Sequence, residues 1–107
     1  MTLDCSKIAA DFAASVNMES GELEAWLETD ESRRVGFKRD GGGESVGHAS
    51  GRRIVELLRS GPSRDEDYRH MRKTVGFIRR HRAREPANMA TSRWRYSLMN
   101  WGHDPLR

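Results

Sequence analysis

Apolar residues recur every three or four positions in five separate segments, which is the spacing of one face of an α-helix. The segments predict helices at about 4–16, 47–59, 64–84 and 91–101, and a short second helix whose apolar stripe is Leu23, Trp26 and Leu27. No segment alternates strictly between apolar and polar residues, as a half-buried strand would, and no internal repeat occurs. The pattern therefore predicts an all-α fold, a compact domain of four or five helices.

The third and fourth predicted helices follow each other closely. Ile54, Leu57 and Leu58 lie on one side of the third helix, and a Gly-Pro pair ends it. Ser63 is followed three residues later by Glu66, which matches a capping box for the start of the fourth helix.

Residues 30–46 lack the helical pattern. Gly41, Gly42 and Gly43 lie in the middle of this stretch, where regular structure would be entropically costly. We expect a long, flexible, glycine-rich loop between the second and third helices. A chain of 107 residues supports one modest core, so we expect a single domain over residues 1–107.

The fourth helix has two contrasting faces at about 100° per residue. One broad arc carries Tyr68, His70, Met71, Thr74, Val75, Phe77, Ile78 and His81. The opposite arc carries Arg69, Arg72, Lys73, Arg79, Arg80 and Arg84, with only Gly76 and Ala83 between them. Asp65 and Glu66 lie only at the first turn of this helix. Because a solvated helix face normally mixes both signs of charge, a face that is of one sign beyond its first turn is unusual.

The last predicted helix carries Trp94, Leu98 and Trp101 at i, i+4 and i+7. Aromatic rings among arginines can stack on nucleobases, but this helical spacing favours packing in the core. Gly102 is typical of a helix end. We expect residues 103–105 to fix the exit of the chain, so that the tail closes the core.

Charge is segregated along the chain. The net charge is +3, with −7 over residues 1–31 and +10 over residues 32–107. A basic half of this kind is typical of a protein that binds polyanions. The alternative is that the acidic segment folds back and neutralises the basic one within the domain.

No catalytic pattern is present, and we expect neither an enzyme nor a cofactor. A single cysteine excludes an internal disulfide, and no His or Cys pair has metal-ligand spacing. The glycine-rich segment lacks the Lys-Ser/Thr pair of a phosphate-binding loop. No apolar run approaches the roughly 18 residues of a membrane span, and no signal peptide is recognisable. We therefore expect an intracellular protein without a membrane segment.

Four short segments stand out, namely 16–18 (VNM), 22–27 (ELEAWL), 51–55 (GRRIV) and 94–105 (WRYSLMNWGHDP). Over about residues 12–106 the chain resembles the uncharacterised family catalogued as domain of unknown function 3140, which is found in bacteria and fungi. Some members are labelled DNA-binding proteins, so the resemblance implies that label for this chain. The family has no catalytic residues to carry over. This chain departs from the members of that family at Glu19-Ser20, where they tend to have Thr-Pro.

These observations favour a small DNA-binding or chromatin-associated protein with little sequence specificity. We expect it to contact phosphates, of DNA rather than RNA, through a basic helix face. The candidate residues are Arg69, Arg72, Lys73, Arg79, Arg80 and Arg84, extended by Arg52 and Arg53 on the third helix. The expected location is the cytoplasm or nucleoid, or the nucleus of a eukaryote. The alternative is a protein-interaction module whose basic helix docks an acidic partner or a second copy.

Overall fold

Six α-helices occur in the computed structural model, which describes residues 3–38, 42–88 and 92–107. They are α1 (Cys5–Ser15), α2 (Ser20–Leu27), α3 (Asp30–Arg34), α4 (Val46–Ser60), α5 (Asp65–Arg82) and α6 (Arg93–Asn100). No strand occurs in the described ranges. The all-α prediction is confirmed, but the described residues form six helices instead of the expected four or five. The described ends of α1, α4, α5 and α6 lie within two residues of the predicted ones. The predicted start of the last helix, at 91, lies outside the described residues.

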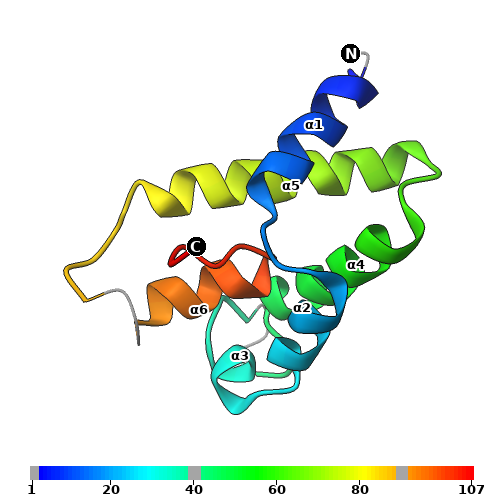
Figure 1. The fold of residues 1–107 in the computed structure, drawn as a ribbon. Helices are drawn as coiled ribbons and strands as arrows, with labels where there is room; N and C mark the ends of the chain where they lie inside the picture. Colours follow the sequence, from blue (N-terminus) through cyan, green and yellow to red (C-terminus); the bar gives the residue numbers. More distant parts are fainter. Residues whose placement is uncertain (1–2, 39–41, 89–91) are drawn as a thin grey trace.

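The longest helix, α5, lies between α1 and the other four described helices (Figure 1). The first helix, α1, crosses and packs against α5, while α2 packs against α4 on the other side. The last helix, α6, contacts α2, α3, α4 and α5. The Cα radius of gyration of 13.4 Å is that of one compact domain of this length.

The core draws apolar side chains from every helix except α3. Its buried members are Ile8, Phe12, Val16, Met18, Leu23, Leu27, Ile54, Val55, Leu57, Met71, Val75, Ile78, Leu98 and Trp101. The prediction for α4 needs one correction, because Leu58 is exposed and Val55 takes its place in the core. Within the tail, Leu98 and Trp101 are buried, whereas Trp94 is only half-buried.

The expectation that all of 30–46 is loop is wrong, because α3 begins it. The Thr29 hydroxyl accepts a hydrogen bond from the backbone N–H of Ser32 and caps the helix. Acidic residues in its first turn and arginines in its last turn complement the helix dipole. Its buried side chain is Ser32, not an apolar residue. Gly42 and Gly43 lie outside any helix, and Gly41 lies outside the described residues. The flexibility of this segment stays a prediction.

The start and end of α5 also differ from expectation. The helix begins at Asp65, so its third residue is Asp67 rather than Glu66. The Asp67 carboxylate accepts hydrogen bonds from the backbone N–H groups of Ser63 and Arg64, at 2.9 and 3.2 Å. The helix ends at Arg82, so Arg84 lies just beyond it.

The C-terminal tail fastens to the turn between α1 and α2. Gly102 has a positive φ of 83°, and its carbonyl accepts hydrogen bonds from the backbone N–H groups of Asn17 and Met18. The side-chain oxygen of Asn17 accepts from the backbone N–H of Asp104 at 2.7 Å. A ring nitrogen of His103 lies 2.6 Å from the carbonyl oxygen of Ser15. The tail is thus held against the connection between the first two helices.

None of the helices in the described ranges combines the length and the apolar character needed to cross a lipid bilayer.

Candidate nucleic-acid interface

The outward face of α5 and the residues just after it carry most of the predicted cations. Five of them are exposed and have no ion-pair partner among the described residues. We call these five the basic ridge: Arg69, Arg72, Lys73, Arg80 and Arg84. The small residue Gly76 lies within the ridge, where the Arg80 guanidinium folds over it. These cations are free to meet an outside anion.

The other three predicted contact residues form ion pairs within the chain. Arg79 lies 3.7 Å from Asp11 of α1. Arg53 donates a hydrogen bond to Asp67 at 3.1 Å. Arg52 forms two hydrogen bonds with the carboxylate of Glu44. Unlike the ridge cations, these three arginines therefore already have carboxylate partners within the chain.

Two of these pairings hold their carboxylates firmly ionised. The pKa of Asp67 falls to about 2, because the Ser63 backbone and then Arg53 donate hydrogen bonds to it. The pKa of Glu44 also falls to about 2, chiefly through its hydrogen bond from Arg52, assisted by one from His48. Ionised carboxylates at these positions keep the positive charge of Arg52 and Arg53 locally balanced.

The acidic N-terminal segment neutralises other bases of the chain. Glu24 of α2 accepts two hydrogen bonds from Arg59 of α4, at 3.0 and 3.2 Å. Glu22 pairs with Arg107, and Asp11 pairs with Lys7 as well as with Arg79. Part of the charge segregation is thus balanced within the domain, whereas the basic ridge is not.

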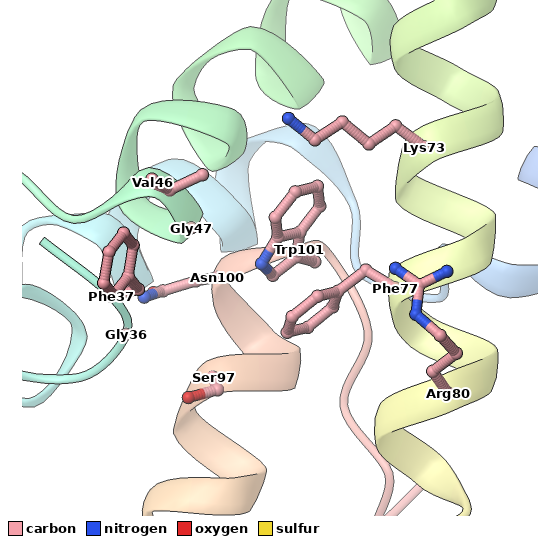
Figure 2. Close-up of a pocket in the computed structure, with 10 residues that line it drawn as sticks. All are labelled: Gly36, Phe37, Val46, Gly47, Lys73, Phe77, Arg80, Ser97, Asn100 and Trp101. Carbon is pink, nitrogen blue, oxygen red and sulfur yellow. The ribbon is translucent and has the colours of Figure 1, made fainter. Parts of the chain in front are cut away.

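A cavity of about 320 Å³ opens beside the ridge (Figure 2). Its walls come from the segment after α3, the start of α4, the middle of α5 and the end of α6. The residues that line it are Gly36, Phe37, Val46, Gly47, Lys73, Phe77, Arg80, Ser97, Asn100 and Trp101. We call it the aromatic cavity. Two ridge cations, Lys73 and Arg80, therefore also belong to its wall.

Aromatic rings give the cavity its character. Phe77 stacks on Trp101, with ring centroids 4.5 Å apart and planes inclined by 16°. Opposite them lies Phe37, whose side chain is 71% exposed even though the chain buries most of its large apolar residues (Figure 2). The carbonyl of Phe37 accepts a hydrogen bond from the Val46 N–H at 2.8 Å, which ties its backbone to the start of α4.

A second cavity of about 540 Å³ adjoins the first and shares Val46 and Lys73 with it. Ser50 and His70 face each other in its wall, with Oγ and Nε2 2.9 Å apart. Burial, followed by the charges of Arg53 and Lys73, lowers the pKa of His70 to about 4. The ring is therefore neutral near pH 7 and serves as a hydrogen-bonding group.

Sequence reasoning missed both cavities. Phe37 falls in a stretch without a helical pattern, and the helical spacing of Trp101 predicts only packing in the core. An isolated phenylalanine after a glycine, in an otherwise polar segment, is the one signal that pointed to an exposed ring.

The fold and the surface together define a small all-helical protein with a basic ridge beside an aromatic cavity. The chain belongs to the family described as protein of unknown function (DUF3140), whose profile matches residues 11–99. Neither the curated proteins nor the solved structures contain a significant match to it.

Proposed function

We propose that the chain binds nucleic acid through the basic ridge, with DNA as the first polymer to test. The observation that carries the proposal is the row of five exposed cations that have no ion-pair partner in the described part of the chain. The phosphates of a nucleic acid would supply the negative charges that these cations lack within the fold.

The length of the ridge suits a phosphate backbone. Arg69 and Arg80 are eleven residues apart, which is about 16 Å along a helix. Duplex DNA carries about nine phosphate charges over that length of its axis. Several of the cations can therefore neutralise phosphates at the same time and release counterions.

We expect low sequence specificity. Between Arg69 and Arg84 the outer arc carries only arginine, lysine, glycine and alanine, so guanine is the one base that these side chains can read directly. Contacts of arginine and lysine with phosphates position a protein on DNA but carry no sequence information. A general DNA-associated role in the nucleoid or in chromatin fits this chemistry.

An acidic protein partner is the competing function, and the intramolecular ion pairs weaken one version of it. The carboxylates of Asp11, Glu22 and Glu24 already bind cations of their own chain. A second copy would have to break those pairs before its acidic segment could dock on the ridge. Free DNA requires no such exchange.

The experiment is fluorescence anisotropy of a labelled duplex of mixed sequence, titrated with the protein at low salt. The double variant Arg69→Glu/Arg80→Glu should weaken binding at least about tenfold, since it reverses two phosphate contacts. The matched control is Arg33→Glu/Arg59→Glu, which changes the net charge equally away from the ridge. We expect the control to retain most of the affinity.

Equal losses in the two double variants would mean that overall charge, not the ridge, drives binding. Absence of binding by the unmodified protein at low salt would overturn the proposal. An acidic peptide would then be the ligand to titrate against the same variants.

A further inference from the structure

The indole of Trp101 presents its N–H, a hydrogen-bond donor, to the aromatic cavity. Its side chain is 4% exposed, yet its Nε1–H has no hydrogen-bond partner among the described residues. Figure 2 shows this nitrogen facing the cavity, on the side of Gly47. Because the N–H opens to the cavity, an acceptor atom of a ligand can take the place of solvent as its hydrogen-bond partner.

The remaining wall defines what kind of ligand would fit. Phe37, Val46 and Phe77 supply apolar surface for a flat group. Lys73 and Arg80 are hydrogen-bond donors only, and both carry positive charge. The cavity therefore suits a planar group with acceptor atoms that is attached to an anion. Its volume of about 320 Å³ lies at the lower end of the range for ligand pockets.

Continuity with the basic ridge narrows the choice further. Lys73 and Arg80 line the cavity and also belong to the ridge, so a polymer whose phosphates follow the ridge would pass its opening. An unpaired nucleobase combines a flat ring, acceptor atoms and an adjoining phosphate. We propose that the aromatic cavity holds a nucleobase taken out of its helix, and that the protein prefers single-stranded to duplex DNA. This inference rests on the proposed function of the ridge.

In this arrangement the base stacks on Phe37 and meets the edges of the Phe77–Trp101 pair, whose faces already stack on each other and on His81 and His70. One acceptor atom of the base accepts a hydrogen bond from the Trp101 N–H. Lys73 and Arg80 hold the phosphates on either side. Stacking of bases on aromatic side chains tolerates any sequence, because every base has a π-face. A closed duplex cannot offer a base to the cavity, so it gains only the phosphate contacts.

The experiment compares labelled oligothymidylate with its duplex on oligoadenylate by fluorescence anisotropy, at one salt concentration. We expect about tenfold tighter binding of the single strand, the gain of one stacked base. Phe37→Ala should bring the single strand close to the duplex affinity and leave the duplex unchanged. Because Phe37 is so exposed, this variant keeps the fold. Leu106→Ala, which shortens another exposed apolar side chain, is the matched control.

A second variant tests the cavity from its opposite wall. A Cβ atom added at Gly47 would lie 3.0 Å from Trp101 Nε1, so Gly47→Ala narrows the space in front of the indole N–H. We expect it to weaken single-strand binding selectively. Tryptophan fluorescence should also change when the single strand binds to the unmodified protein and not when the duplex does.

The outcomes separate this inference from the function on which it rests. Equal affinity for single strand and duplex, both insensitive to Phe37→Ala, would overturn the cavity's role and leave the ridge intact. Absence of binding to either form would overturn the proposed function as well. A fluorescence change with thymidine monophosphate but not with the oligonucleotide would make the cavity a small-molecule site and would also contradict the inference.

Discussion

At the scale of single residues, His70 is the side chain of α5 that packs beside the buried ring of Trp101. Its ring lies parallel to that of Trp101, with centroids 6.2 Å apart, and its Nε2 faces the Ser50 hydroxyl. Burial and the charges of Arg53 and Lys73 hold its pKa at about 4, against an opposing influence of Asp67. The ring is thus neutral in the folded chain over a range where the unfolded chain is protonated.

This difference predicts a dependence of stability on pH. Because the pKa is lower in the folded state than the ordinary value of 6.5, the stabilisation is complete above pH 6.5 and is lost as the pH falls toward 4. We expect the free energy of unfolding to decrease by about 1 kcal/mol between pH 7 and pH 5, after allowance for partial solvent screening. Burial lowers the pKa of His81 and His103 in the same direction.

Urea denaturation at a series of pH values measures this effect. His70→Gln keeps a hydrogen-bonding group opposite Ser50 and should flatten the dependence between pH 7 and pH 5. The carboxylates of Glu44 and Asp67, with pKa values of about 2, act only at lower pH, since their stabilisation is lost below about pH 4.5. An unchanged slope in His70→Gln would contradict the assignment.

Asn100 shows where sequence reasoning stops at this scale. Its buried side chain accepts a hydrogen bond from Trp26 Nε1 at 2.7 Å and donates one to the Ser32 carbonyl at 3.0 Å. Both partners are about seventy residues away in the chain, and periodicity carries no information on such pairs. The resemblance marked the tail as distinctive, and the structure shows that Asn100 joins α2, α3 and α6 there.

At the scale of elements, apolar periodicity was a reliable guide wherever a helix buries a full stripe. The five longer helices were predicted on that basis. The helix α3 was not predicted, because its five residues form no apolar stripe and the side chain that it buries is a serine. The signals that were available were Thr29 as a cap and the order of acids before arginines, both of which act locally.

The crossing of α4 with its neighbours depends on Gly51. A Cβ atom there would lie 2.4 Å from the Asn100 carbonyl oxygen and 2.7 Å from a methyl carbon of Leu27. Gly51→Ala should therefore lower the free energy of unfolding by about 1–3 kcal/mol, the usual cost of overpacking. Its matched control is Gly21→Ala in α2, where a Cβ atom would meet no atom within 4 Å.

Chemical denaturation followed by far-UV circular dichroism distinguishes the two variants. Gly21→Ala should be neutral or stabilising by up to about 1 kcal/mol, because alanine is the better helix former. Equal stability of the two variants would show that α2, α4 and α6 have room to move apart.

At the scale of the whole molecule, the sequence indicated which face of α5 is basic, but not which of the predicted cations are free of intramolecular ion pairs. Four ridge residues on α5 followed from the helical arc alone. The pairing of Arg52, Arg53 and Arg79 depends on carboxylates from other parts of the chain, which only the fold brings close. The aromatic cavity was beyond reach for the same reason, since its rings come from three separate segments.

The central claim is that the five cations of the basic ridge meet phosphates. The most direct test is the slope of log Kobs for duplex binding against log salt concentration. We predict a slope of about −4 to −5 if all five release counterions, smaller by about 1 in Arg69→Gln and unchanged in Arg59→Gln. A slope near zero, or an equal change in both variants, would contradict the account.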